Sequence, residues 1–364
     1  MPFNCETHTA MVYDRGGFTR LGVIDPLTAV SWERVRDDIS FGRITTTQPT
    51  MQCLRLLEQI EPNRHELVIF RGTERVWEGP ITLIVYGRDT VEIEARDVMH
   101  YAYRTVMRVG YNNAYPNVTT TTQRAVNVLT GELARKEALD PPINVLPHLV
   151  AVHSANDSRT SRNTAPSQST VFEDVDSMAA KAGLDYTVVG RSIVLFNVHT
   201  NIGQTAQVTE ADFIGDVIVT AYGMEHATKA WVNDGQGNIG YAGVDVDPYY
   251  GEWEILDSAY DEEKGSDAPT LDELFSQAAR NIAGRNPVPL TVRVPEGSRL
   301  NPNGALSIAD LVPGVHIPLR ATLTARVVNQ MQRLNKVQVT EDSSSGEVIT
   351  VSMTQAAADD EGAA

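Results

Sequence analysis

The chain has 364 residues, more than one hydrophobic core usually organises, so two to four domains are expected. Hydrophobic residues make up 42% and charged residues 21%, and no stretch approaches the roughly 20 apolar residues of a membrane helix. Lys and Arg total 30 against 47 Asp and Glu, a net charge of −17. This acidity argues against a nucleic-acid-binding module, because such modules gain affinity from basic surfaces.

The N-terminus and the cysteines bear on the compartment in which the chain is made. Residues 1–6 lack the basic start and apolar stretch of a secretory signal, so we predict a soluble protein made in a cytosol. Cys5 and Cys53 are the only cysteines, too few for a disulfide framework and not in the C-x-x-C pairing of zinc sites. We therefore expect two buried thiols.

Residues 1–108 are predicted to form a first small antiparallel β-barrel. Residues 91–95 alternate between apolar and polar as a half-buried strand does, and residues 66–71 and 76–77 flank a Gly-containing hairpin loop. Several short strands at such close spacing favour a barrel or a sandwich. A helix follows near Asp97, which is a suitable N-cap.

Residues 109–205 are predicted to form an α/β domain. Thr170 and Glu173 have the spacing of a capping box, and Gly183 suits the end of the helix that they open. The two strand-like runs within 184–196 flank the pair Gly190-Arg191, which predicts a hairpin.

Strand character returns after residue 205 and is interrupted once. We predict a second, discontinuous β-barrel from residues 206–232 and 286–355, with residues 233–285 as an inserted subdomain containing one helix. Thr270 and Glu273 repeat the capping-box spacing at the start of that helix. The predicted class is thus α+β and mostly β.

Two segments are predicted to lack regular structure. Residues 154–170 are rich in Ser, Thr, Asn and Arg, which predicts a mobile loop that could take part in interfaces. Residues 356–364 are small and acidic and are expected to form a disordered tail.

Common catalytic and cofactor-binding motifs are absent from the sequence. The sequence has no G-x-S-x-G elbow, H-E-x-x-H pair, Walker A loop or G-x-G-x-x-G before a helix. His148 and His153 are five residues apart, which on a strand places them on opposite faces and disfavours a shared metal site. We assign no catalytic, cofactor-binding or metal-binding residues and expect no enzyme activity.

The densest acidic segment spans residues 245–263 and has three readings. It could be a calcium loop, although the EF-hand spacing is absent, or it could carry a pair of glycosidase carboxylates. The third reading is a solvated acidic loop anchored by aromatic side chains. Its residues are Asp245, Asp247, Glu252, Glu254, Asp257, Asp261, Glu262 and Glu263, interleaved with Tyr249, Tyr250 and Trp253.

The order and spacing of six short segments carry a resemblance to a known family. The sequence resembles the minor tail (hub) proteins of long-tailed, siphovirus-type phages that infect actinobacteria. The segments are SWERVRDDIS at 31–40, ELVIFRG at 66–72, VWEGPI at 76–81, VEIEARD at 91–97, GLDYTVVGR at 183–191 and ADLVPGV at 309–315.

This resemblance implies a tail-tip baseplate hub with two β-barrels per subunit, the second interrupted, and an α/β domain. It also implies a homotrimer that joins the tail tube to the tip, with a distal tail protein, a tape measure protein and other tail-tip proteins as neighbours. Genomic DNA would be met only in transit, and acidic walls would keep it from adhering. The expected location is the virion tail tip, after assembly in the host cytoplasm. The competing prediction is a carbohydrate-binding or wall-degrading tip protein that uses Glu252, Trp253 and Glu254.

Overall fold

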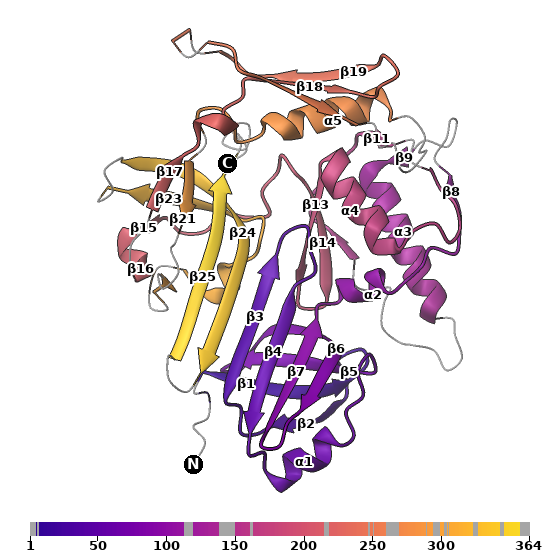
Figure 1. Ribbon diagram of the computed structural model, residues 1–364, viewed down its shortest axis with the longest axis vertical. Coiled ribbons are helices and arrows are strands. Elements are labelled where there is room, and N and C mark those ends of the chain that lie inside the picture. Colours follow the sequence, from indigo (N-terminus) through magenta and orange to yellow (C-terminus); the bar gives the residue numbers. More distant parts are fainter. Residues whose placement is uncertain are drawn as a thin grey trace.

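The structure is a computed structural model, and it is mostly β (Figure 1). The described residues form three hydrophobic cores: one under the β-rich body, one in an α/β unit and one in a small inserted unit. No helix in the described parts of the chain is long and apolar enough to cross a membrane. The structure describes residues 5, 7–112, 119–137, 150–160, 163–214, 218–246, 248–249, 251–259, 269–288, 290–293, 299–301, 304, 306–322, 327–342 and 346–356.

The N-terminal strands form an antiparallel sheet with one short helix against it. The predicted strand 91–95 is confirmed, with Val91, Ile93 and Ala95 buried on one face. The predicted hairpin is tighter than expected, because only Gly72 and Thr73 separate its two strands. The elements are β1 (His8–Asp14), β2 (Arg20–Ile24), β3 (Ala29–Val35), β4 (Phe41–Thr47), α1 (Met51–Leu57), β5 (His65–Arg71), β6 (Glu74–Tyr86) and β7 (Thr90–Arg96).

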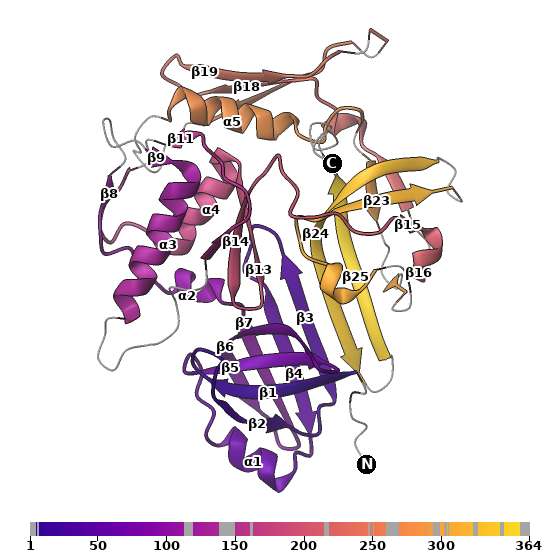
Figure 2. The ribbon, with the colours of Figure 1, turned by 180° about the vertical axis from the view of Figure 1, so that it is seen from behind.

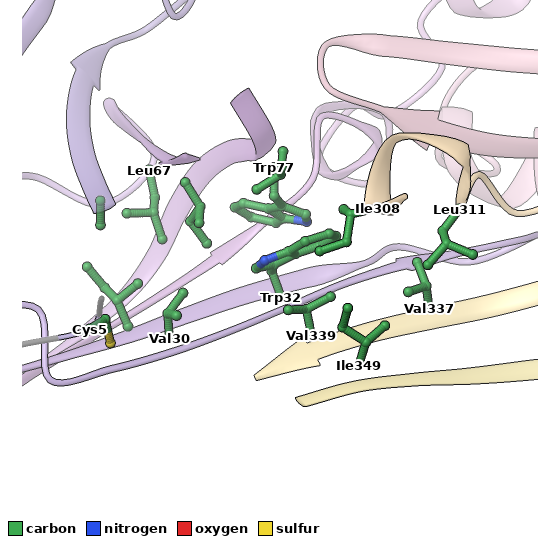
Figure 3. Close-up of a cluster of buried hydrophobic side chains, with 14 of the residues drawn as sticks. Cys5, Val30, Trp32, Leu67, Trp77, Ile308, Leu311, Val337, Val339 and Ile349 are labelled. Carbon is green, nitrogen blue, oxygen red and sulfur yellow. The ribbon is translucent and has the colours of Figure 1, made fainter. Parts of the chain in front are cut away.

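The C-terminal strands extend this same sheet. The sheet continues from β3 into β24 (Val328–Asp342) and β25 (Gly346–Gln355), with Trp32 opposite Val339 in the antiparallel register. Trp32 packs in one core with Trp77 of β6 and with Val339 and Ile349 of the C-terminal strands (Figure 3). The two β-rich regions therefore share a sheet and a core. Their division into two barrels stays a prediction.

The remaining elements of the C-terminal β region are short. Ala356, predicted to belong to the disordered tail, is instead buried, and its amide donates to the Met331 carbonyl; residues 357–364 lie outside the described ranges. These elements are β15 (Val208–Thr209), η2 (Glu210–Asp212), β16 (Phe213–Ile214), β17 (Ile218–Ala221), η3 (Gly223–Glu225), β21 (Leu290–Arg293), β22 (Arg299–Leu300), η4 (Ile308–Asp310) and β23 (His316–Ala321).

The α/β unit packs its helices against a small three-stranded sheet (Figure 2). The helix Met99–Tyr103 was expected in the first barrel, up to residue 108, but it belongs to the core of this unit. The capping box of Thr170 and Glu173 is confirmed, as are the left-handed Gly183 at the helix end and the hairpin at Gly190-Arg191. The elements are α2 (Met99–Tyr103), β8 (Tyr111–Asn112), β9 (Thr119–Thr120), α3 (Thr121–Glu137), β10 (Val150–Val152), β11 (Arg159–Thr160), β12 (Asn163–Thr164), α4 (Val171–Ala182), β13 (Leu184–Val189) and β14 (Ser192–Asn197).

The predicted mobile loop at 154–170 is instead tied to its own unit where it is described. The Asn156 amide group donates to the carbonyls of Ala182 and Gly183, at 2.6 and 3.0 Å. β11 and β12 each pair with a neighbouring strand. The prediction of a mobile loop rested on the polar composition of this segment, but polar side chains such as Asn156 hydrogen-bond within the protein.

The inserted unit is a three-stranded sheet with one helix across one face. Its elements are β18 (Lys229–Asn233), β19 (Ile239–Gly243), β20 (Glu254–Ser258) and α5 (Leu271–Ile282), and the predicted capping box of Thr270 and Glu273 is confirmed. Gly240 lies so close to Leu274 that only glycine fits there. β18 was expected in the second barrel up to residue 232, but it pairs with β19 and β20 and belongs to this unit's core.

Candidate functional site

The predicted acidic segment is in part a strand rather than a loop. Glu252 pairs with Lys229 at 2.7 Å, and Glu254 accepts the indole N–H of Trp231 at 3.1 Å. Asp257 faces α5 and accepts the amide groups of Gln277 and Asn281, each at 2.9 Å, which lowers its pKa. Each of these carboxylates thus has a partner inside the inserted unit. Of the remaining predicted residues, Asp245, Tyr249 and Trp253 are described, and both aromatic side chains are exposed rather than anchoring the segment. The others lie outside the described residues: Asp247, Tyr250, Asp261, Glu262 and Glu263.

The described residues contain no group of three or more His, Cys, Asp or Glu that could hold a metal ion. His153 is exposed, with its ring Nε2 at 3.1 Å from the Asn201 carbonyl, whereas His148 lies outside the described ranges. Cys5 and Cys53 are buried free thiols, as predicted. Burial and the neighbouring Glu341 raise the pKa of Cys5 to about 12, so this thiol stays protonated and unreactive.

Sequence reasoning missed three buried ionic clusters at the joints between the units. The first, the Asp185 cluster, connects the N-terminal β region, the α/β unit, the inserted unit and the C-terminal β region. Asp185 of β13 is fully buried and lies 3.2 Å from Arg36, 2.9 Å from Arg280 of α5 and 3.2 Å from Arg333 of β24. Asp37 completes the cluster, 3.4 Å from Arg36 and 3.6 Å from Arg280. Three guanidinium groups thus surround two carboxylates.

Asp37 also couples the end of β3 to the α/β unit through the backbone. Its amide donates to the Tyr186 carbonyl and its carboxylate accepts the Tyr186 amide, both at 2.9 Å. Burial and the nearby Asp185 carboxylate raise the pKa of Asp37 to about 6, although Arg36 and Arg280 act in the opposite direction. The joint therefore contains a carboxyl that titrates above its usual range.

The second, the Glu66 cluster, places the tip of the β13–β14 hairpin on the N-terminal sheet. Arg191 in that tip forms an ion pair with the buried Glu66 of β5 and lies 3.6 Å from Glu78 of β6. The Tyr101 hydroxyl donates to Glu66 at 2.6 Å, and Arg75 pairs with Glu78 at 3.1 Å. Burial and Glu66 raise the pKa of Tyr101 well above its usual value, so its hydroxyl remains a donor.

The third, the His8 cluster, joins β1 and β3 to the C-terminal strands. The indole N–H of Trp32 donates to Nε2 of His8 at 3.2 Å, so Nδ1 carries the proton and donates to Glu341 at 2.6 Å. Arg71 holds Glu347 of β25 with two bonds of 2.7 and 2.8 Å. The His8 ring is fully buried, and no Ser, Thr or Cys side chain bonds to it within the described residues. The imidazole and carboxylate therefore serve as a joint between strands.

The sequence did hold a signal for these clusters. The segments that carry the resemblance contain Trp32, Arg36 and Asp37, then Glu66 and Glu78, and finally Asp185 and Arg191. They are far apart in the chain but meet at the three joints. Charged residues are rare at buried strand positions, and those that occur there are usually in ion pairs.

Comparison with known proteins bears on the fold. The sequence matches no protein-family model and no curated protein. The structure is similar to the 43 kDa tail protein of prophage MuSo2 from Shewanella oneidensis, with a TM-score of 0.57 at 14% identity over 95% of this chain and 98% of that one. It is similar to the tail protein from Neisseria meningitidis MC58, with a TM-score of 0.58 at 10% identity over 96% and 97% of the two chains.

A third similar structure is the c3393 protein of E. coli, a type VI secretion component described as similar to the phage T4 tail proteins gp27 and gp5. Its TM-score is 0.53 at 10% identity, over 92% of this chain and 75% of that one. The predicted fold class is confirmed by these likenesses: the chain has a mostly β fold of the kind that phage tail proteins have.

Proposed function

We propose that this chain is a non-enzymatic structural component of a phage tail tip. The observation that carries the proposal is agreement over nearly the whole length of both chains with two phage tail proteins. The likeness therefore extends over nearly the whole chain, rather than over one common motif within it.

The buried clusters support a structural role. The Asp185 cluster joins four parts of the chain around one carboxylate, and the other two clusters fix the hairpin and the C-terminal strands on the N-terminal sheet. Moving the units apart would leave buried charges without their partners, which is energetically costly. The clusters therefore resist relative movement of the units. Rigid connections between units suit a structural subunit that holds neighbouring proteins in fixed positions.

Within the tail, we propose a central hub ring of three copies that joins the tube or distal tail ring to the tip and lines the DNA exit path. A distal tail protein and a tape measure protein would be its neighbours, and the phage would be a siphovirus of actinobacteria. The net charge of −17 supports a lumen wall that does not bind passing DNA.

Imaging of purified particles tests both the assignment to the tail tip and the trimeric ring. With the chain tagged, we expect label at the end of the tail away from the head and three-fold symmetry in the density there. Deletion of the gene is expected to give heads without complete tails, restored by the intact chain in trans. A tag found only in unassembled protein would contradict the tail assignment, and two-fold or six-fold density would contradict the trimer alone.

A further inference from the structure

The sheet of the inserted unit has one face opposite α5 that carries exposed side chains. Ala230 and Val232 of β18 point to α5 and form the unit's core with Leu274. Because side chains alternate along a strand, Lys229, Trp231 and Asn233 point the other way. In both views α5 lies between this sheet and the rest of the molecule, so the opposite face points outward (Figures 1 and 2).

One row across this face is apolar. Tyr241, Trp231 and Leu256 are in register on β19, β18 and β20, and they form what we call the Trp231 row. Leu256 is 76% exposed and Tyr241 is 53% exposed, while Trp231 between them is half-buried. Ile239 on the next row is 54% exposed. Contiguous exposed apolar side chains of this kind mark sites of interaction.

The central side chain of the row is held in place. The Trp231 indole N–H donates to Glu254 at 3.1 Å, and its ring stacks on Tyr241 with 5.3 Å between the ring centres. Tyr241 in turn makes an edge contact with Phe275 of α5 at 6.3 Å. A tryptophan fixed in this way loses little side-chain entropy on binding, a property of the residues that dominate protein interfaces.

The charges beside the row are predominantly negative. Glu254 lies beside the row, in register with Lys229, and Lys229 is paired with Glu252 at 2.7 Å. A second copy that met this face with its own would bring four carboxylates and only two Lys229 ammonium groups into one small area, an excess of negative charge that is costly across an interface. The face fits a different protein that is apolar at its centre and basic at one side.

We propose that the Trp231 row is a docking surface for a second protein, one that presents an apolar side chain next to a Lys or Arg. This inference rests on the proposed tail assembly, which supplies the partner: a neighbouring tail protein. The apolar side chain covers Leu256 and Trp231, and the basic group pairs with Glu254.

Site-specific photocross-linking within assembled particles tests the proposal. Leu256→benzoylphenylalanine is incorporated into the full chain, and the same reagent at Leu271, exposed at the start of α5 and off the face, is the matched control. We expect cross-links from position 256 to a different protein, at a peptide containing Lys or Arg. Leu256→Asp should reduce the amount of that protein in the particles at least tenfold, whereas Leu271→Asp should not.

Other outcomes would overturn the inference. Cross-links only between copies of this chain would identify a self-contact, and protection by added cell-wall glycan without a protein adduct would identify a glycan surface. If the chain is present in the particles but position 256 gives no adduct, the docking surface is wrong and the tail assignment stands. If the chain is absent from the particles, both are wrong.

Discussion

The two β-rich regions and the inserted unit are attached to the rest of the molecule in different ways. Between β3 and β24 the sheet and the hydrophobic core are continuous, and the His8 cluster adds polar bonds to a joint that is already apolar. The inserted unit has a core of its own. Its attachment to the rest of the molecule includes polar bonds of Arg280 with Asp185, of Thr270 with the Arg159 carbonyl, and of Thr160 with Glu273.

This difference predicts an order of local stability. Separating the two β-rich regions would expose their shared apolar core, whereas the inserted unit keeps its own core when its contacts with the body break. We therefore expect the inserted unit to open before the body does. Four predictions follow from this comparison of the inserted unit with the β-rich body.

The largest effect is expected at the Asp185 cluster. Asp185→Asn leaves three arginines without their shared buried carboxylate, which should lower the free energy of unfolding by about 3–5 kcal/mol. Hydrogen exchange should rise in both α5 and β24, because Arg280 and Arg333 each lose a partner.

Asp174→Asn is the matched control. Asp174 is equally buried, lies 3.1 Å from Arg124, and both residues belong to the α/β unit. Its loss should raise exchange in α3 and α4 and leave α5 protected. Equal exchange in α5 for the two variants would contradict a role of Asp185 in holding the inserted unit.

The second prediction concerns pH and the body. Burial raises the pKa of Asp97 to about 7, against the effect of the bonds that it accepts from the Ser40 and Met99 amides at 2.6 and 2.9 Å. The folded state therefore holds a proton that the unfolded state releases near pH 4. Stability should fall as pH rises from about 4 to about 7 and then level off, by up to about 1.4 kcal/mol per pH unit.

Urea unfolding of the parent protein and of Asp97→Asn at several pH values between 4.5 and 7.5 measures this slope. Asp37, whose pKa is raised to about 6, contributes with the same sign in both proteins and cancels in the difference. The stability of the parent relative to the variant should decline with pH. Parallel profiles would show that Asp97 stays ionised across this range.

The third prediction targets the inserted unit alone. A Cβ on Gly240 would lie 2.3 Å from the backbone carbon of Leu274, so Gly240→Ala should force α5 away from the sheet and cost about 1–3 kcal/mol. Gly243→Ala on the same strand meets nothing closer than 3.5 Å and is the control. Limited proteolysis should cut the Gly240→Ala protein within the inserted unit first. Simultaneous loss of the whole fold would mean that this unit does not open independently.

The smallest effect is expected from the helix caps. Thr170→Ala and Thr270→Ala each remove a capping box, worth about 1 kcal/mol. Thr270 also donates to the Arg159 carbonyl at 3.1 Å, so its loss should additionally raise exchange at the contact between α5 and β11. Identical hydrogen exchange around β11 in the two variants would show that the Thr270–Arg159 bond does not help to hold the inserted unit.

Local patterns alone determined much of the fold. Both capping boxes, the left-handed Gly183, the Gly190-Arg191 hairpin and the alternating strand at 91–95 depend on residues that are close in sequence. The same reasoning failed at 154–170, because a polar composition does not reveal whether side chains bond to water or, as Asn156 does, to their own protein.

Long-range pairing was decided only by the tertiary structure. Nothing near Asp185 in the sequence indicates that Arg36, Arg280 and Arg333 surround it, since each of the three lies at least 95 positions away from it along the chain. The pairing of β3 with β24, and the row that aligns Tyr241, Trp231 and Leu256, likewise depend on strand register. Local sequence sets backbone conformation through short-range sterics and hydrogen bonds, whereas buried charges and shared cores are settled by which segments meet when the chain is packed.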